Sequence, residues 1–585
     1  KCLSMKNKYC MRGLSLVASC LLMISCLDLD PKAQMGDNLV WNKADNFQLF
    51  ANQFYSWSRD FSLSADKNYG NGVYDGPHSD YRSDLVAAAS VNTYSQGTNV
   101  IPSEDANYTA LYKQIYYTNL LLNHAESFED KAAIAIPVAE AKFFRAYCYF
   151  ELVQIWGDAI LLTEPLDLDS EKLYAKQNDR GEVVDQIIID LKEAAESLPE
   201  TADMGRLTKY AAYAMLSRVA LYEGTWQKFH TNGADTNENT ERSSELLTIA
   251  KDAAYNVIKD NKYELFYNEV LGNQSYRYMF ILEDAAQCNP ANLNKSSNKE
   301  YIFVHRHRDG DKNIDITHAM LANACYITRK MANMYLCSNG LPIEKAGDTF
   351  KGYSGAATEF INRDNRMNNT LIQHEQLYWN NDGTWRTTWT DEDEKNALKM
   401  NVRSNSGYQN YKWCVERQVP DWYESIDYPV IRYAEVLLNY TEAIYELSGN
   451  IANDELVYLN KVRKRINPTM PDLTNEFVAK NGLSMREEIR RERTVELFLE
   501  GFRIDDLKRW ATAPAEMVQP QLGIQFTGTW FESNWNNQSR KLNEDGCIIL
   551  YDDRVWDNKL YLYPLPSDQL QLNPQLKQNP GWGNN

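Results

Sequence analysis

The stretch Met485–Trp510 carries an apolar stripe at helical spacing with a series of charges beside it. The apolar positions recur as one face of a helix would; they are Val495, Phe498, Leu499 and Phe502. The charged positions lie three or four residues apart and can neighbour each other along that helix; they are Arg493, Glu496, Glu500 and Arg503. Charges close to a core persist only when they are paired. The pattern therefore predicts a series of ion pairs along the helix, an ion-pair ladder, that fixes this helix against others. Gly501 is expected to interrupt the helix.

The same stretch has the carboxylate spacing of a metal site in a helix bundle. Glu492, Glu496 and Glu500 lie four residues apart. That chemistry normally adds a Glu-x-x-His pair from neighbouring helices. The last histidine of the sequence is His374, so the chain after that residue, which includes this stretch, has no Glu-x-x-His pair. The structural ladder is therefore the favoured interpretation, because ion-pair networks often imitate functional sites.

Length and composition narrow the class of protein. A chain of 585 residues with 44% apolar content can bury a sizeable core, as one large domain or several. Its 37 Tyr and 14 Trp exceed what a core needs, and such rings supply binding area with a polar tip. The net charge of −19 argues against binding to nucleic-acid phosphates and against charge-driven adhesion to anionic lipid.

The first residues have the order of an export signal. The apolar run Leu14–Ile24 is too short to span a bilayer and follows several cationic residues, as a signal peptide does. It ends at Ser25-Cys26, a small residue before cysteine that resembles the bacterial lipobox. We therefore expect residues 1–25 to be a lipoprotein signal peptide and Cys26 to be the lipidated residue. The alternative is cleavage by an ordinary signal peptidase, with Cys26 incidental.

The cysteines after the leader form no C-x-x-C pair, which argues against zinc and thioredoxin-like sites. Cys325 and Cys337 could form a disulfide in an oxidising compartment. Cys148 lies amid helix aromatics and is expected to be a small buried hydrophobe.

Helical periodicity recurs along most of the chain. Between the first two helices, residues 62–102 are rich in Gly, Asn, Asp, Ser and Tyr, which marks a long loop of the kind that often carries function. Antiparallel helix pairs with alanine at contact points resemble tetratricopeptide repeats, although the period is irregular. The predicted helices are 41–57, 107–125, 137–156, 183–198, 208–222, 243–259, 428–447 and 453–465.

The segment 268–424 interrupts this pattern. Residues 300–307 alternate like a strand, and Gly and Asn become more frequent. Trp385 and Trp389 lie beside the turn signal Asn381-Asp382-Gly383, which predicts a hairpin tip. Aromatic residues also cluster within the segment, namely Tyr276, Tyr278, Trp379, Trp385, Trp389, Tyr408, Tyr411 and Trp413.

Several short segments of the chain have recognisable sequence motifs. They are the stretch 485–510, the run 137–162, the turn Asn339–Ile343, the segment Asn362–Arg366 and the closing lines 563–566 and 579–582. Together they resemble the SusD/RagB family of outer-membrane nutrient-binding lipoproteins, over nearly the whole mature chain. The resemblance implies a mainly α fold: a tetratricopeptide-like scaffold of helical pairs that carries a large irregular α+β insertion. We expect an N-terminal helical region at 26–267 with the binding loop 62–102, a ligand-facing insertion at 268–424 and a closing region at 425–585.

The resemblance also implies a function without catalysis and without a cofactor or metal. Such a protein holds a glycan at the cell surface, over a SusC-like TonB-dependent transporter, and is attached to the outer membrane through its lipid. No nucleic-acid partner is expected. The alternative is binding of a peptide or another non-sugar solute, or a role as lid or adaptor for the same transporter.

Sugar recognition needs flat rings that stack on the sugar C–H face and polar side chains that bond pairs of hydroxyls. The resemblance places such residues on the loop after the first helix and on the insertion. Each aromatic among them has the alternative role of a local packing anchor. The predicted ligand-binding residues are Asp66, Asn68, Tyr69, Tyr81, Arg82, Tyr276, Tyr278, Trp379, Trp385 and Trp389.

Other candidate sites are weaker. His305 and His307 could ligate a metal from alternating strand positions, but no third ligand is evident. The acidic run 390–395 fits a solvated loop better than a shaped calcium site. Glycoside hydrolysis needs two carboxylates that flank one bond, and no signature supports such a pair.

Overall fold

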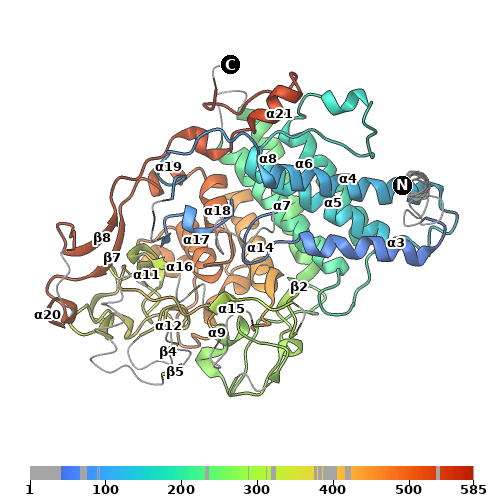
Figure 1. Ribbon diagram of the computed structural model, residues 1–585. Helices are drawn as coiled ribbons and strands as arrows, with labels where there is room; N and C mark the ends of the chain where they lie inside the picture. The colour runs from blue at the N-terminus through green and yellow to red at the C-terminus, as the bar shows by residue number, and fades with distance from the viewer. Residues whose placement is uncertain are drawn as a thin grey trace, which may run out of the picture.

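The computed structural model shows a mainly helical molecule (Figure 1). The leader with Cys26, the residues Asp66, Asn68 and Tyr69, Trp389 and the acidic run 390–395 lie outside the described residues. The structure describes residues 41–65, 76–88, 90, 92–230, 236–286, 289–310, 312–317, 320, 325–373, 378–379, 385–386, 405–415, 423–534 and 540–583.

The first half of the chain is a stack of long helices, each of which packs on the next along the chain from α4 to α8 (Figure 1). The predicted helices of this half are all present with shifted ends. The 41–57 helix begins as α and tightens to 3-10 geometry for its last six residues, Asn52–Trp57. The helices are α3 (Ala44–Ala51), α4 (Ala106–Ser127), α5 (Ala135–Trp156), α6 (Arg180–Ser197), α7 (Lys209–Phe229) and α8 (Thr236–Ile258).

Helices α5 and α7 lie at the centre of this stack, where they are buried on nearly every side. Almost all of α5 from Phe143 to Trp156 is buried, and alanines such as Ala146 let neighbouring helices approach closely. The side chain of Asp105 caps α4, and that of Thr208 caps α7. These caps fix where the two helices begin.

The insertion is built from short elements, as predicted. The expected strand at 300–307 is β2 (Tyr301–His305), which pairs antiparallel with β6 (Tyr428–Arg432). The prediction of a helix over 428–447 is therefore wrong at its start, since the helix α14 begins only at Tyr433. The other elements here are α9 (Ser275–Met279), β3 (Tyr326–Ile327), which pairs with β1 (Val86–Ala87), α11 (Arg329–Met334), α12 (Asn365–Thr370), β4 (Tyr378–Trp379) and β5 (Trp385–Arg386).

The C-terminal part returns to the first half of the chain. Helix α14 packs on α7 and α8, so the two helical regions are in direct contact. The elements are α14 (Tyr433–Ser448), α15 (Val457–Lys464), α16 (Asn475–Lys480), α17 (Met485–Glu496), α18 (Arg503–Arg509), α19 (Ala513–Glu516), β7 (Gln521–Gln525), α20 (Trp530–Asn534), β8 (Cys547–Tyr551) and α21 (Ser567–Leu572).

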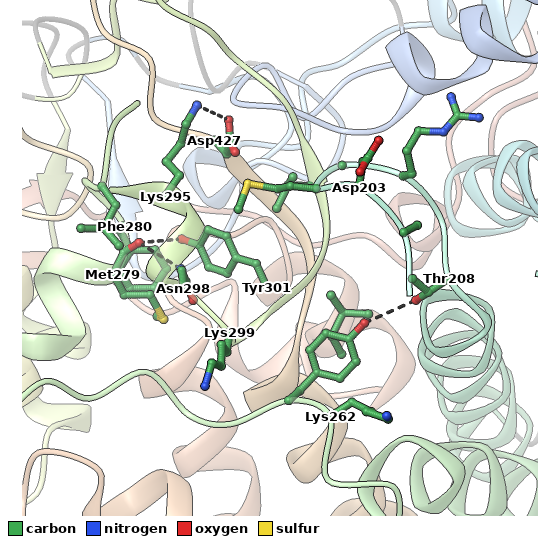
Figure 2. Close-up of a pocket in the computed structure, with 18 residues that line it drawn as sticks. Asp203, Thr208, Lys262, Met279, Phe280, Lys295, Asn298, Lys299, Tyr301 and Asp427 are labelled. Carbon is green, nitrogen blue, oxygen red and sulfur yellow. Dashed lines mark hydrogen bonds and ion pairs between the residues drawn. The ribbon is translucent and has the colours of Figure 1, made fainter. Parts of the chain in front are cut away.

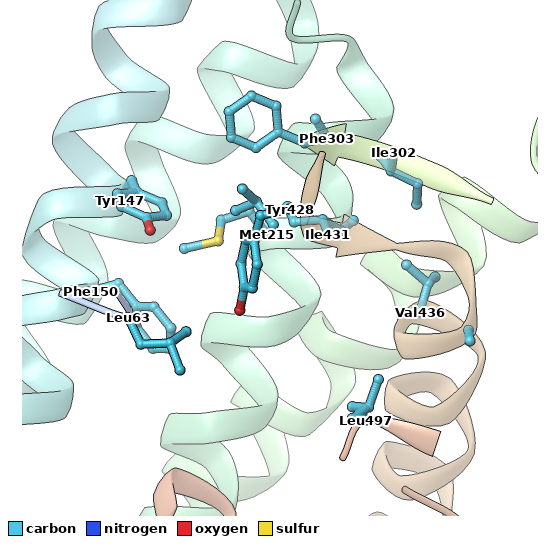
Figure 3. Packing of buried hydrophobic residues seen from close by; sticks show 14 of the residues in the cluster. Leu63, Tyr147, Phe150, Met215, Ile302, Phe303, Tyr428, Ile431, Val436 and Leu497 are labelled. Carbon is cyan, nitrogen blue, oxygen red and sulfur yellow. The ribbon is translucent and has the colours of Figure 1, made fainter. Parts of the chain in front are cut away.

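One hydrophobic cluster joins all three parts of the chain (Figure 3). Phe150 of α5 and Met215 of α7 belong to the same cluster as Phe303 of β2, Ile431 of β6 and Leu497 after α17. The insertion is therefore built onto the scaffold through β2 and β6.

The stretch 485–510 is not one continuous stripe of helix. Helix α17 ends at Glu496, and the backbone passes through left-handed geometry at Leu499 (φ 60°) and Gly501 (φ 76°) before α18 begins. The backbone N–H of Leu499 donates to Asp80 Oδ2 at 2.7 Å. A Cβ at position 501 would lie 2.6 Å from Leu63 Cδ2, so glycine is required there.

The carboxylates of Glu492, Glu496 and Glu500 are buried and paired, which confirms that these charges are structural. Arg432 Nη1 lies 2.7 Å from Glu496 Oε1, and Arg432 Nε lies 2.6 Å from Glu500 Oε2. Arg366 Nη1 lies 2.6 Å from Glu492 Oε1, and Arg465 also pairs with Glu496. The partners thus come from elements distant in sequence, and we name these six side chains the buried ion network.

The predicted ladder within the stretch is wrong in detail. Arg493 pairs with Asp506 at 2.8 Å, and Arg503 pairs with Asp84 at 2.7 Å, so neither bonds Glu496 or Glu500. The turn at 497–502 separates the charges that a continuous helix would have aligned. Among the described residues no group of three metal-ligating side chains occurs, here or elsewhere.

Three further observations bear on the sequence predictions. Cys325 and Cys337 are both free and buried, so they are not paired with each other. Cys148 is fully buried in α5, as expected. Within the part of the chain that the structure describes, no helix is both long and apolar enough to cross a bilayer.

Replacement of Glu496 by Gln should destabilise the protein strongly. Burial alone would raise the pKa of Glu496, but Arg465, Arg432 and Arg366 hold it well below its usual range, so its charge is part of the fold. Removing one partner from a buried network leaves uncompensated charge and costs about 3–5 kcal/mol. Urea unfolding would measure this loss. Glu487→Gln on the exposed side of α17 is the matched control and should change the free energy of unfolding by about 0.5 kcal/mol or less. Equal effects of both variants would refute the structural role of the network.

Asp80 should make stability depend on pH. Burial raises its pKa to about 7, against the opposing effects of the Leu499 hydrogen bond and the charges of Lys412 and Arg503, while Asp84 adds to the rise. Its Oδ1 has no partner among the described residues. An unfolded carboxyl titrates near pH 4, so between about pH 4 and 7 the folded state holds the extra proton and loses stability as pH rises.

Asp80→Asn should remove this dependence. The free energy of unfolding of the variant, relative to the native protein, should rise by up to about 1.4 kcal/mol per pH unit across that window. Urea unfolding at pH 5 and pH 7 would measure the difference. Asp348→Asn at an exposed position is the control and should give the same difference at both values. A difference between Asp80→Asn and the native protein that is the same at pH 5 and pH 7 would contradict the assignment.

Candidate functional site

The described part of the predicted binding loop, residues 76–88, is anchored in the core. His78 is 1% exposed, with Nδ1 2.6 Å from Asp505 Oδ2 and Nε2 3.0 Å from Glu151 Oε2. Arg59 Nε pairs with the same Glu151 at 2.7 Å. The backbone N–H of Gly76 donates to the carbonyl of Ser62 at 3.1 Å. The loop is therefore held firmly at both ends of the segment 66–75.

Tyr81 and Arg82, both predicted to contact ligand, are engaged inside the protein. They lie in the 3-10 turn Asp80–Arg82 and are half-buried. Burial, and a hydrogen bond with Cys325, raise the pKa of the Tyr81 hydroxyl. Arg82 donates to the hydroxyl of Tyr563 and lies 5.5 Å from the centre of that ring. Their arrangement serves the anchoring of the loop.

The prediction that Tyr276 and Tyr278 stack on a ligand does not fit the structure. The two residues are 1% and 3% exposed, because α9 packs into the hydrophobic cluster. The hydroxyl of Tyr276 donates to the carbonyl of Glu496 at 2.6 Å. The two rings fill the core beside the buried ion network. They therefore have the alternative role of local packing anchors.

The tryptophan segment forms the predicted hairpin. Strand β4 pairs antiparallel with β5, and the register places Trp379 opposite Trp385. The signal Asn381-Asp382-Gly383 lies between the two strands. His305, proposed above as a weak metal ligand, instead has Nδ1 3.0 Å from Ser58 Oγ, and its ring lies 5.3 Å from that of His307.

A cavity of about 250 Å³ lies where the α6–α7 connection meets the insertion (Figure 2). Several of the polar groups around it are already bonded within the protein. The Tyr301 hydroxyl donates to the carbonyl of Met279 at 3.1 Å, and Lys295 Nζ lies 3.0 Å from Asp427 Oδ1. A sugar would have to displace these bonds, so the cavity fits a joint between scaffold and insertion better than a ligand site.

A second hollow of about 320 Å³ follows α4, with Tyr108, Tyr112 and Tyr116 one turn apart on one side of the helix. The connection between α5 and α6 and the end of α21 border it, and Gln575 Nε2 bonds the carbonyl of Tyr174 at 2.6 Å. Large apolar side chains are exposed around it, and we name them the apolar patch: Tyr116, Leu168, Leu173, Tyr174 and Leu572.

A third hollow, of about 600 Å³, is an open groove between α11, α17, β7 and β8. Its walls carry the cationic side chains Arg329, Lys330 and Arg491, and we name it the basic groove. Sequence analysis missed it because its residues come from four separate segments. The only local signal was Arg329 and Asn333 at helical spacing, just before the signature turn at Asn339.

Comparison with protein families places both halves of the chain. The model of the SusD family matches residues 286–582, which is half of the chain. A second model, described as starch-binding associating with outer membrane, matches residues 27–221.

The similarity to named relatives and to solved structures covers four-fifths or more of this chain. SusD-like protein P25 of Formosa agariphila is 25% identical and covers 97% of both chains. A SusD-like protein of Bacteroides ovatus is 22% identical, over 81% of this chain and 80% of its own.

The fold is that of a SusD-like carbohydrate-binding protein from Bacteroides fragilis, with a TM-score of 0.71 and 21% identity over 92% of this chain and 100% of that one. The surface glycan-binding protein A of Bacteroides fluxus gives a TM-score of 0.60 with 18% identity, over 92% and 99% of the two chains. On the match to its family model, the chain belongs to the SusD family, whose members are binding proteins rather than enzymes.

Proposed function

We propose that this protein captures an oligosaccharide or polysaccharide at the cell surface and delivers it to a SusC-like TonB-dependent transporter of the outer membrane. The observation that carries the proposal is membership of the SusD family, joined to the N-terminal match with a model described as starch-binding and associating with the outer membrane. The surplus of Tyr and Trp supports a carbohydrate ligand, since flat rings stack on sugars.

The ligand face we propose carries the β4–β5 hairpin and the segment 66–75. Trp379 and Trp385 stand opposite each other in the hairpin. Asp66, Asn68, Tyr69 and Trp389 complete the proposed set, while Tyr276 and Tyr278 are excluded by burial. The ends of the segment 66–75 are tied to the core through Ser62 and His78, which gives a variable loop a rigid base.

The apolar patch supports a protein partner. Its residues include Leu168, which is 99% exposed, and Leu572, which is 66% exposed. Exposed apolar side chains mark a protein interaction site when they form a contiguous patch. A transporter that covers this patch would leave the proposed ligand face to the glycan. The same observation supports the alternative in which the protein is a lid or adaptor for its transporter and binds a non-sugar solute.

A glycan panel tests the main proposal. The purified protein should retain at least one polysaccharide in affinity electrophoresis, and Trp379→Ala should weaken that binding tenfold or more, which corresponds to about 1.4 kcal/mol of lost stacking. Co-purification with the transporter should persist in the variant. Tyr267→Ala, at a ring 54% exposed outside the proposed face, is the control and should bind as the native protein does. Retention of no glycan would remove the sugar ligand and favour the lid or adaptor.

The lipid anchor at Cys26 is part of the proposal. Cys26→Ala should shift the protein from the membrane fraction to the soluble fraction, because a diacylated cysteine supplies the buried hydrocarbon that holds it there. Cell fractionation followed by immunoblotting would measure the shift, with Cys20→Ala as the matched control. Unchanged membrane association of Cys26→Ala would count against lipidation and favour a different attachment.

A further inference from the structure

The basic groove has the size and construction of a ligand site. Its volume of about 600 Å³ falls within the range of about 300–1,000 Å³ that small-molecule sites occupy. The elements around it are labelled together in Figure 1, where α11 and α17 lie beside β7. Helix α11 contacts both β7 and α17, so part of the wall is regular structure, while Glu344, Pro520 and Asp545 lie in adjoining turns and irregular chain. The lining residues are Arg329, Lys330, Asn333, Met334, Glu344, Arg491, Pro520, Leu522, Gln525, Asp545 and Cys547.

The cations of the groove differ in how they are compensated. Lys330 Nζ lies 2.5 Å from Asp84 Oδ2 and also pairs with Glu516. Arg491 pairs with Glu488 at 3.3 Å. Arg329 forms no ion pair with a carboxylate among the described residues. This is notable in a chain that has 80 acidic and 61 basic residues.

Arg329 is nevertheless held in a fixed position. Its guanidinium lies 4.5 Å from the centre of the Tyr353 ring and donates through Nη2 to the hydroxyl of Tyr353. Glu359, which acts on Arg329 through its charge, accepts the Tyr408 hydroxyl at 2.9 Å. A guanidinium stacked on an aromatic ring is a pre-oriented fork for a planar or tetrahedral anion.

Two polar atoms of this wall lack partners in the described structure. They are Nη1 of Arg329 and Oδ1 of Asn333, a donor and an acceptor, and both are buried. A buried polar atom that is left unpaired is destabilising. The two residues are four apart on α11, which puts their Cβ atoms about 5–6 Å apart on one face. A ligand that offers an anionic acceptor next to a hydroxyl donor would satisfy both.

We propose that the basic groove binds an acidic sugar unit, a uronic acid or a sulfated sugar, within the glycan. The acidic group accepts from Arg329, and a hydroxyl of the same ring donates to Asn333. Glu344 and Asp545, which also line the groove, accept further hydroxyls. This inference rests on the proposed function and deepens it, because it selects anionic glycans among the possible ligands. A neutral sugar satisfies Asn333 but offers the guanidinium only an uncharged acceptor.

The groove carries both cationic and acidic side chains, and this restricts the anions that it can bind. Glu344 and Asp545 are exposed, whereas Arg329 is half-buried, so a simple inorganic anion meets repulsion at the mouth and attraction at the wall. An oligosaccharide can place its carboxylate at Arg329 and its hydroxyls at the acidic rim. Free sulfate or phosphate shares only the first of these contacts.

Isothermal titration calorimetry on the full-length protein tests the proposal with defined probes. These are tetragalacturonic acid, its fully methyl-esterified form, a sulfated galactan tetrasaccharide and sodium sulfate. At least one acidic tetrasaccharide should bind tenfold or more tightly than the neutral ester. Arg329→Gln should abolish this preference, and Asn333→Asp should weaken the acidic probe at least tenfold by adding like charge. Arg242→Gln on α8, outside the groove, is the matched control and should bind normally. Unchanged thermal unfolding of Arg329→Gln shows that the variant is folded.

The contrary outcomes are distinct. Equal binding of acid and ester, or an unaltered preference in Arg329→Gln, overturns the acidic-sugar site. If sulfate binds the groove as tightly as the acidic tetrasaccharide does, the groove is a general anion site, and this outcome overturns the proposal as well. If neutral polysaccharides of the panel are retained while both acidic probes fail, the inference falls and the proposed glycan function stands. If no probe and no polysaccharide binds, both fall.

Should Arg329→Gln prove unfolded, Arg329→Lys keeps the charge without the planar fork. It should lose most of the preference for the acidic probe, while thermal unfolding stays close to that of the native protein. An undiminished preference in this folded variant would overturn the role of the guanidinium.

Discussion

Everything in this molecule depends on the burial of Glu496 among arginines. Three guanidinium groups reach that carboxylate from three different elements: Arg366 from α12, Arg432 from β6, and Arg465 at the end of α15. Charges of this kind are costly to bury, so each is stable only while the others are present. The hydrophobic cluster provides the larger driving force, but apolar contacts alone do not fix the orientation of packed elements. The ion network supplies that orientation and holds the insertion against the last helices.

The sequence supported the class of fold because long helices leave a periodic trace. Helix α5 begins two residues before its predicted start and ends as predicted, and the strand β2 falls within the expected 300–307. The break after Glu496 was not predictable from the pattern. The hydrogen bond to Leu499 comes from Asp80, 419 positions earlier, and the close contact that requires Gly501 comes from Leu63. Local spacing contains no information about either partner.

The same limit applies to the site. Tyr276 and Tyr278 lie in an aromatic-rich, irregular segment, and that composition does not distinguish a ring that faces ligand from one that fills a core. The loop after the first helix was expected to present ligand residues, yet His78, Asp80 and Asp84 point its described part inward. Conversely, Arg329 and Asn333 were not predicted as site residues, because a basic and an amide residue four apart on a short helix are common. Their significance comes from Tyr353, β7 and β8, which only the tertiary structure brings close.

The separation in sequence of the partners of Glu496 also governs the order in which the molecule can form. Arg366, Arg432 and Arg465 all precede Glu496 in the sequence, and Asp80 accepts its hydrogen bond from the later residue Leu499. Neither half of the chain can therefore complete its core alone. Contacts of such long range delay folding until loop closure over most of the chain has been achieved. A ribosome must therefore deliver about five-sixths of the polypeptide before the native core can close. Until then Asp80 and the three arginines lack the partners that they bind in the native core.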